Sequence, residues 1–374
     1  MKVIRVLISA LALVLLTSSA SSASVAASST PAYGKAGPHT VGVTTIDLGI
    51  SAPKFGERFA TVYYPSSLSS SDVADLAKFS YTQADTLPSG FQSFLPAQYN
   101  LPTTVDAYPN IPGSTAGPYP IVLFDFGASG QRLLYSNLLS GIASWGYVVV
   151  AADYFEHSLA AQVMGVRAQP SAALDLSVML SSLDAIERAS ADPASVLHGT
   201  AKSSRVAAIG HSAGGETAFN ALNSPRVATA IGWSPVGPVG RRSKKPIMII
   251  RPTGDHVITA ARVNREYANF PGPKALVEPS GEGHNTYTDT CVVIRNGGGL
   301  IQYAIAHHLV AAKLAQLGFN GCLASDLAPA RFWPVVQYYT VFQLRARLGN
   351  GPTTVPAPPA GMFPGFNISI TQSG

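Results

Sequence analysis

The chain of 374 residues is 47% hydrophobic and only 12% charged. This composition supplies enough apolar material for one large core or two small ones, and it excludes disorder for most of the chain. The formal net charge of +5 is modest, and Lys2 and Arg5 at the N-terminus contribute part of it. The charge balance therefore does not indicate a nucleic-acid partner.

Residues 1–23 have the pattern of a secretory signal peptide, because Lys2 and Arg5 precede an apolar stretch that small residues follow. That stretch is too short to cross a hydrocarbon core of about 30 Å, and no later stretch approaches about 20 apolar residues. We therefore expect a secreted protein, extracellular or periplasmic, without an integral membrane segment. An uncleaved N-terminal anchor is the alternative. Residues 24–38, mainly Ser, Ala, Pro and Gly, predict a flexible segment.

Residues 39–348 contain no internal repeat and no linker that would divide two cores, which favours one catalytic domain. Short apolar or alternating runs predict eight strands, at residues 43–50, 58–64, 121–126, 147–152, 206–209, 228–233, 247–250 and 275–277. From residue 121 onward they alternate with helical patterns, at residues 133–145, 172–189, 214–222, 260–269 and 299–317. This alternation predicts an α/β fold with a mostly parallel central sheet of about eight strands and helices on both faces.

Three segments depart from the alternation. Residues 65–119 form a long stretch with many aromatic residues and prolines, which predicts a lid over the site or a meandering cover over the sheet edge. Residues 349–374 are rich in Pro and Gly and predict a poorly ordered C-terminal tail. The basic cluster Arg241, Arg242, Lys244 and Lys245 lacks interleaved aromatic residues, so we interpret it as a solvated loop rather than a nucleic-acid site.

The only two cysteines are Cys291 and Cys322. Export would place them where a disulfide persists, so we expect them to be bonded. Closing the loop between them would stabilise the fold by about 3–4 kcal/mol in the chain-entropy model. Two free buried thiols are the alternative.

Residues 210–214 read Gly-His-Ser-Ala-Gly and stand between an apolar run and a helix-forming segment. This is the pattern of a nucleophile elbow in the context that it requires, a strand followed by a helix. Glycine two residues on either side of Ser212 permits a strained turn and a close approach of strand and helix. We therefore predict that Ser212 is exposed as a nucleophile.

A serine hydroxyl is a weak nucleophile, so an imidazole must accept its proton and a carboxylate must orient that imidazole. After such an elbow the acid and then the histidine follow along the chain, each in a loop after a late strand. Asp255 follows the predicted strand at 247–250, and His284 follows the one at 275–277. Their order and placement predict a catalytic triad of Ser212, His284 and Asp255.

Other titratable residues fit these roles less well. His307 lies in an apolar helical pattern that indicates a structural role, and Asp289 and Glu282 are too near His284 in sequence to reach behind its ring easily. His157 precedes the serine and is better placed to line the cleft than to act as the base. As walls of the substrate pocket we predict one histidine and two aromatic residues, with the core as the alternative location: His157, Trp233 and Tyr287.

The tetrahedral intermediate of acyl transfer needs two backbone N–H donors, each worth about 3–4 kcal/mol in the barrier. One donor is expected at Ala213, directly after the nucleophile. The other is expected in the turn after the third strand, Phe-Gly-Ala-Ser-Gly at residues 126–130, where we nominate Ala128. An ordinary glycine-rich turn from strand to helix is the alternative interpretation.

Several blocks resemble one family. They are Pro-Ile-Val-Leu-Phe-Asp-Phe-Gly from residue 120, Ala-Ser-Trp-Gly-Tyr-Val-Val-Val-Ala-Ala-Asp from residue 143, Gly-His-Ser-Ala-Gly-Gly from residue 210 and Gly-His-Asn-Thr-Tyr-Thr-Asp from residue 283. Together they resemble plasma-type platelet-activating factor acetylhydrolases and their bacterial relatives, and they are also similar to dienelactone hydrolase-like and polyester-degrading enzymes.

This resemblance implies the α/β-hydrolase fold and ester hydrolysis by the residues already nominated: Ser212, Asp255, His284, Ala128 and Ala213. One position departs from the family, because relatives commonly have His-Gly where this chain has Phe126 and Gly127. The backbone donor survives that change. The polar layer beneath the oxyanion hole, and with it the family's substrate preference, does not carry over.

We therefore expect a serine ester hydrolase that works through an acyl-enzyme, without a metal or organic cofactor. Its substrate would be a small-molecule or lipid ester, with a role in lipid degradation and transient contact with lipid surfaces. Rival interpretations are a phospholipase like platelet-activating factor acetylhydrolase acting on short acyl chains, and a polyester hydrolase. From another class, the chain could be a catalytically silent hydrolase fold used for binding. The sequence carries no signal for an oligomeric state.

Overall fold

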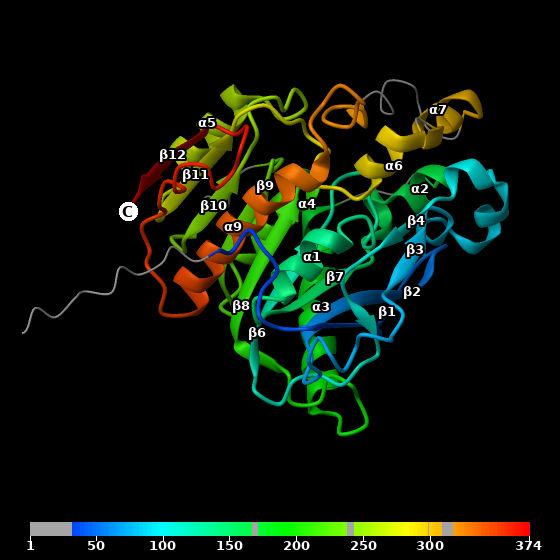
Figure 1. Ribbon diagram of the computed structural model, residues 1–374, viewed down its shortest axis with the longest axis horizontal. Helices are drawn as coiled ribbons and strands as arrows, with labels where there is room; N and C mark the ends of the chain where they lie inside the picture. Colours follow the sequence, from blue (N-terminus) through cyan, green and yellow to red (C-terminus); the bar gives the residue numbers. More distant parts are fainter. Residues whose placement is uncertain (1–31, 167–170, 238–242, 298, 309–316) are drawn as a thin grey trace, which may run out of the picture. The chain divides into compact units, whose positions relative to one another are not determined.

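The computed structural model describes residues 32–166, 171–237, 243–297, 299–308 and 317–374 (Figure 1). The predicted signal peptide at 1–23, most of the predicted flexible segment at 24–38, and Arg241 and Arg242 of the basic cluster lie outside the described residues.

A ten-stranded sheet forms the centre of the fold, in the order β12-β11-β10-β9-β8-β6-β7-β2-β1-β5. Six neighbouring strands run parallel: β11 (Lys274–Pro279), β10 (Ile247–Ile250), β9 (Val227–Trp233), β8 (Ala201–His211), β6 (Tyr119–Asp125) and β7 (Val148–Ala152). The strands β2 (Gly56–Pro65) and β1 (Val41–Ala52) continue the sheet in antiparallel pairing. The eight predicted strands are all present, and two short edge strands extend the sheet.

The parallel strands are buried along their length because helices cover the sheet. Every residue of β7 and β10 is buried, in keeping with their unbroken apolar sequences. In one group of helices, α1 (Ser136–Ala143) packs against α9 (Pro329–Leu348); in the other, α3 (Ala172–Ala191) packs against α4 (Ala213–Ala221) (Figure 1). A further helix, α5 (Ala260–Asn269), precedes β11. The observed sheet and helices confirm the predicted fold class.

The helix α9 was not predicted. It has 20 residues, of which 14 are buried, and its apolar residues lie on all sides rather than on one stripe. A helix that is buried all round has no amphipathic period of 3.6 residues, so the sequence pattern did not indicate it. For the helix predicted at residues 299–317, the described part of the chain contains α7 (Gly299–Ala306), which follows α6 (Thr290–Gly297); residues 309–316 lie outside the described part.

The C-terminal segment contradicts the prediction of a poorly ordered tail. Its last residues form β12 (Ile368–Ser373), which pairs antiparallel along the whole of β11. Near the other end of the chain, the Gln337 amide donates to the carbonyl oxygens of Tyr33 and Lys35, and the Tyr33 ring packs edge-on against Trp145. The described part of the segment predicted to be flexible is therefore tied to the body of the fold.

The segment 65–119 has secondary structure of its own. It contains a small sheet of β3 (Ser80–Thr82) and β4 (Pro102–Thr104), the edge strand β5 (Tyr108–Pro109), and the short 3-10 helices η1 (Ala84–Thr86), η2 (Ser89–Phe94) and η3 (Ala97–Tyr99). The Tyr81 hydroxyl donates to the Asp289 carboxylate over 3.1 Å, which links this cover to the loop before α6. We refer to residues 65–119 as the cover segment.

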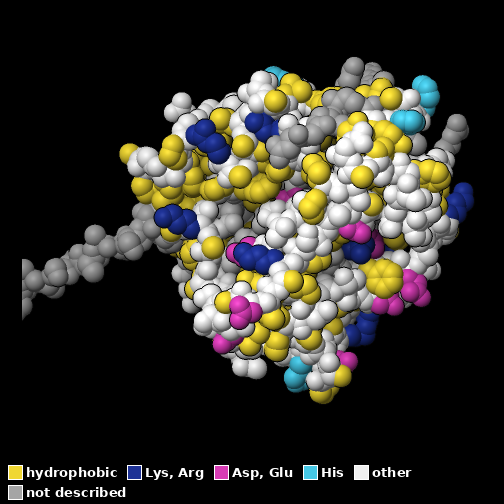
Figure 2. All heavy atoms as spheres, turned by 45° about the vertical axis from the view of Figure 1, so that its right-hand side comes forward, with side chains coloured by type: hydrophobic (Ala, Val, Ile, Leu, Met, Phe, Trp, Pro, Cys, Tyr) yellow, Lys and Arg dark blue, Asp and Glu magenta, His cyan; other side chains and the backbone are white. Residues whose placement is uncertain are grey.

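On the face that Figure 2 presents, charged side chains are dispersed among apolar and uncharged polar atoms, and several Lys or Arg side chains lie next to Asp or Glu side chains. Of the basic cluster, the Lys245 ammonium donates to the carbonyl oxygens of Ser224 and Val227, both at 2.6 Å. The Lys245 side chain therefore stabilises the nearby backbone by hydrogen bonding. Within the described ranges, no helix is both long and apolar enough to cross a membrane.

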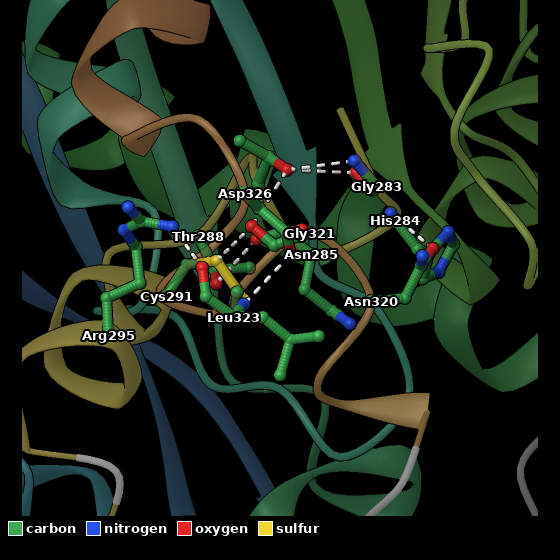
Figure 3. Close-up of a disulfide and its surroundings, with 12 residues drawn as sticks. Gly283, His284, Asn285, Thr288, Cys291, Arg295, Asn320, Gly321, Leu323 and Asp326 are labelled. Carbon is green, nitrogen blue, oxygen red and sulfur yellow. Dashed lines mark hydrogen bonds between the residues drawn. A yellow bond between two sulfur atoms is a disulfide. The ribbon is translucent and has the colours of Figure 1, made fainter. Parts of the chain in front are cut away.

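The two cysteines form the predicted disulfide. Cys291 in α6 is bonded to Cys322, which lies in the loop that leads to α9, and both residues are fully buried (Figure 3). The bridge joins residues 31 positions apart and fastens the chain on either side of α7.

Candidate active site

Ser212 occupies the sharp turn between β8 and α4. Its backbone has φ 51° and ψ −117°, a conformation that L-residues adopt only under constraint. The turn is possible because strand and helix approach each other closely: a Cβ atom on Gly210 would lie 1.9 Å from the carbonyl oxygen of Gly214. The structure thus has the backbone of a nucleophile elbow at the expected residues.

The structure brings Ser212, His284 and Asp255 together. The Ser212 hydroxyl lies 2.9 Å from Nε2 of His284, and Nδ1 of the same ring lies 2.9 Å from Oδ2 of Asp255. All three residues are buried, with exposed fractions of 8%, 5% and 1% respectively. The arrangement gives the imidazole a proton donor on one side and a carboxylate on the other, as a general base requires.

Asp255 is held as a carboxylate. Its Oδ1 accepts the backbone N–H groups of Val257 and Ile258, at 2.9 and 2.8 Å. Burial raises the pKa of this carboxyl, but the hydrogen bonds from His284 and from the backbone outweigh burial and leave the pKa below its usual value. The rival acids lie elsewhere. Asp289 accepts hydrogen bonds from Asn137 and Tyr81, and within the described residues neither carboxylate oxygen of Glu282 forms a hydrogen bond with His284.

The loop after β6 lies beside the nucleophile. A Cβ atom on Gly127 would be 3.1 Å from Cβ of Ser212. Three amides of this loop are engaged: Gly127 donates to the Tyr135 hydroxyl, Ser129 to the His157 carbonyl oxygen, and Gly130 to the Gly127 carbonyl oxygen. In the described part of the chain, no acceptor contacts the amide of Ala128.

Ala213 is the first residue of α4. The N–H groups of a first helical turn have no intrahelical acceptor. Ala213 directly follows Ser212, and Ala128 lines the same cavity as Ser212, so both remain candidates for the two donors of an oxyanion hole.

A second layer of polar residues supports the triad. His211 is fully enclosed, and its Nε2 donates to the backbone carbonyl oxygen of His284 over 2.9 Å. Burial, followed by the nearby His284, holds the pKa of His211 well below its usual value, so this ring is neutral. The elbow pattern left the residue before Ser212 without a role, whereas the structure places it directly under the base.

A cavity of about 560 Å³ opens onto Ser212 and His284. Its walls are mostly apolar and come from two directions: the cover segment contributes Leu87, Phe91, Phe94 and Leu95, and the C-terminal side contributes Tyr303, His307 and Leu317. His307, interpreted from the sequence as structural, therefore faces this cavity. Helical periodicity could not reveal that, because the cavity forms only when α7 and the cover segment come together.

The structure places the three predicted pocket residues outside the cavity lining. The fully buried Trp233 donates its indole N–H to the Thr340 hydroxyl, and the equally buried Tyr287 donates its hydroxyl to the Ile250 carbonyl oxygen. Both belong to the core, the alternative location. The end of β9, where Trp233 lies, and the loop after β11, where Tyr287 lies, were consistent with pocket walls, but both side chains turn inward to bury their aromatic area.

His157, the third of these residues, lies behind the loop at 127–130. Its ring is 3.2 Å from Oδ1 of Asp125 and 3.5 Å from Oδ2 of Asp175, and all three residues are buried. Burial disfavours a charged imidazole, but the two carboxylates outweigh it and raise the pKa of His157 to about 10. The three side chains thus form a buried ionic cluster beneath the candidate oxyanion hole. This cluster lies where relatives of the resembled family have a polar layer that this chain, with Phe126, does not share.

The mostly parallel sheet, the helices on both faces and the elbow after a central strand define an α/β-hydrolase fold. A family model described as Chlorophyllase matches residues 107–255. The platelet-activating factor acetylhydrolase of Cavia porcellus is 31% identical over 131 residues, which are 33% of this chain and 29% of that protein. The chain thus spans less than a third of the length of this relative.

A solved structure of a ferulic acid esterase from Streptomyces cinnamoneus is similar over 90% of this chain and 96% of its own, with a TM-score of 0.63 and 17% sequence identity. The three comparisons relate the chain to α/β-hydrolase esterases.

Proposed function

We propose that this protein is a secreted serine hydrolase that cleaves carboxylic esters through an acyl-enzyme. The observation that carries the proposal is the unbroken chain of hydrogen bonds from Ser212 through His284 to Asp255 at the mouth of a largely apolar cavity. The names of two similar proteins, an acetylhydrolase and an esterase, support the reaction class. The buried disulfide supports an extracellular or periplasmic location.

In the proposed reaction, His284 takes the proton of the Ser212 hydroxyl while the oxygen attacks the ester carbonyl. The N–H groups of Ala128 and Ala213 bind the oxyanion of the tetrahedral intermediate. His284 then protonates the leaving alcohol, and the acyl group stays on Ser212. Water, deprotonated by His284, attacks the acyl-enzyme through a second tetrahedral intermediate and releases the acid.

The cavity favours esters with a sizeable apolar part. Its volume of about 560 Å³ and its aromatic and aliphatic walls leave room beside Ser212 for more than an acetyl group. We therefore place a general carboxylesterase activity first. A phospholipase acting on short acyl chains, supported by the similarity to platelet-activating factor acetylhydrolase, is the second candidate.

The first experiment compares the wild-type protein with Ser212→Ala on p-nitrophenyl esters of increasing acyl length. Ser182→Ala is a matched control, because Ser182 is also buried and the one hydrogen bond of its hydroxyl to a described residue is to the Met179 carbonyl oxygen within α3. We expect Ser212→Ala to reduce turnover by at least about 10,000-fold and Ser182→Ala to leave it near wild type. Equal turnover by wild type and Ser212→Ala would instead favour a silent fold used for binding.

A second assay separates the candidate substrates. The same enzyme is assayed on three substrates: a phospholipid with a short sn-2 acyl group, a long-chain p-nitrophenyl ester and an aromatic polyester film. Preferential release from the phospholipid would favour the second candidate, and release of soluble acid from the film would favour a polyester hydrolase. Preference for the soluble long-chain ester is expected.

A further inference from the structure

Asn320 connects the loop of the candidate base with the loop of the candidate acid. Its Oδ1 accepts the backbone N–H of His284 over 2.8 Å and that of His256 over 3.2 Å. Its Nδ2 donates to the carbonyl oxygen of Gly254 over 3.2 Å. One side chain therefore contacts the backbone of the base itself and the residues on both sides of Asp255. Figure 3 shows Asn320 beside His284.

The backbone around Asn320 packs tightly onto the base loop. The carbonyl oxygen of Asn320 accepts the backbone N–H of Asn285 over 2.9 Å. The side-chain amide of Asn285 donates to the carbonyl oxygen of Leu317 over 2.8 Å. A Cβ atom on Gly283 would lie 2.3 Å from the backbone nitrogen of Gly321. The two loops thus touch through their main chains, which leaves Asn320 little freedom to change its distance from His284.

The disulfide anchors this contact. Cys322 is two residues beyond Asn320, and its bond to Cys291 fastens the loop to α6, which follows the base loop in sequence (Figure 3). Residues further along the loop are held separately, because the Arg295 guanidinium donates to the carbonyl oxygens of Leu323 and Ala324. Arg295 has no described hydrogen bond to the acid or base loop, so the two anchors can be tested apart.

We propose that Asn320 is a positioning residue that sets the separation of His284 and Asp255, and that the Cys291–Cys322 disulfide holds Asn320 in place for that task. The inference rests on the proposed function, because it concerns the geometry of the same triad. Asn320 lies behind the catalytic loops, whereas Asn285, Leu317 and Gly318 face the cavity on this side. Its loss should therefore change the rate of the chemical steps and leave substrate binding nearly unaltered.

The test measures kcat and KM of Asn320→Ala, with Arg295→Ala as the matched control, because Arg295 in α6 holds the same loop at Leu323 and Ala324. We expect kcat of Asn320→Ala to fall about 10- to 100-fold while KM stays within about twofold, since a displacement of about 1 Å in a catalytic group has effects of this size. Arg295→Ala should lose less than about threefold in kcat. A wild-type kcat in Asn320→Ala, or an equal loss in both variants, would overturn the proposal.

Asn320→Asp provides a second readout that does not depend on folding of the alanine variant. The isosteric side chain keeps an acceptor for the His284 and His256 amides, but it loses the donor to Gly254 and adds a negative charge beside the base. That charge favours the protonated imidazole, so the acidic limb of the pH profile of kcat/KM should move to higher pH by roughly half a unit to one unit. An unmoved profile at wild-type kcat would contradict the proposed position of Asn320.

The role of the disulfide is tested with a double-mutant cycle. The pair Cys291→Ser and Cys322→Ser should lower kcat several-fold in the wild-type background and much less in the Asn320→Ala background, since the bridge acts through Asn320. Losses that multiply independently would overturn this link. Failure of the proposed function is distinguishable, because the wild type would then not hydrolyse the ester panel or would do so equally well as Ser212→Ala.

Discussion

The hydroxyl of Tyr135 lies 2.7 Å from Nδ1 of His211. Nε2 of His211 must carry a hydrogen, because its partner is the carbonyl oxygen of His284, which can only accept. In the neutral ring Nδ1 is then an acceptor, so the phenol of Tyr135 donates its proton to it, and the phenol oxygen accepts the N–H of Gly127 over 3.2 Å. Tyr135 therefore connects the loop of the candidate oxyanion hole to the loop of the candidate base.

Replacement of Tyr135 by Phe should remove hydrogen bonds that hold the loop of the candidate oxyanion hole and the loop of the candidate base. Nδ1 of His211 and the Gly127 amide would lose their partner in a buried site, which costs about 1–3 kcal/mol in the free energy of unfolding. We expect kcat to fall about tenfold as well, because the His284 backbone rests on His211. Urea unfolding and ester kinetics measure the two effects. Tyr63→Phe is the control, since the one hydrogen bond of this buried hydroxyl within the described ranges is to Ser136, away from the triad. Equal kcat losses in both variants would argue against the connection.

Asp255→Asn should leave the fold intact and nearly abolish turnover. The isosteric amide can present its NH₂ group to Nδ1 of His284, which favours the wrong imidazole tautomer, and losses of about 10,000-fold in kcat are typical of this change. Thermal unfolding verifies the fold, and a burst assay measures acylation. The matched control is Asp289→Asn, which changes the rival carboxylate held by Asn137 and Tyr81. If both variants lost activity alike, the assignment of the acid would be wrong.

The buried cluster of His157, Asp125 and Asp175 should make stability depend on pH. The pKa of His157 is about 10 in the folded protein, above its ordinary value of about 6.5, so the folded state binds this proton more tightly than the unfolded state. Its contribution is complete below about pH 6.5 and is lost as the pH rises toward 10, by an amount on the order of 2–5 kcal/mol.

Urea unfolding at pH 6.5, 8 and 9.5 measures this loss. His157→Gln removes the titrating group and leaves two buried carboxylates without a cation, which should destabilise the protein by about 3–5 kcal/mol at pH 6.5. The decline in stability between pH 6.5 and 9.5 should be much flatter in the variant than in the wild type. Parallel declines would show that His157 is not the group responsible.

A larger side chain in the cavity should lower the activity on esters with a long acyl chain more than the activity on short ones. Leu159 faces the cavity and donates its N–H to Gly130 of the loop beside Ser212. Leu159→Trp should lower kcat/KM for a long-chain p-nitrophenyl ester about 10- to 100-fold and change that for the acetate by less than about threefold. Leu76→Trp is the control, because Leu76 is exposed and does not line the cavity. A uniform loss across chain lengths would mean that the cavity does not receive the variable part of the ester.

The sequence sufficed for the parts of the protein that follow local rules. Ser212 could be located because an elbow requires glycine at fixed positions between a strand and a helix, and Asp255 and His284 followed from chain order. Parallel strands such as β7 were evident as short unbroken apolar runs.

Other features depend on contacts between distant segments. Trp233 ends β9 and Tyr287 lies in the loop after β11, but only the packing of α9 decides that they point into the core. Asn320 approaches His284 across 36 positions of sequence, and no spacing rule indicates a partner at that distance. The helix α9 itself lacks a polar face, so its burial removed the periodicity by which a helix is recognised.

The antiparallel strand β12 covers the outer side of β11. Without it, the backbone N–H and C=O groups along that side of β11 would be available to a strand from another molecule, and such open edges promote aggregation. A chain shortened before residue 368 should therefore retain all the residues of the candidate site and yet be prone to self-association during production. Purification tags are better placed so that the six-residue strand β12 can still pair with β11.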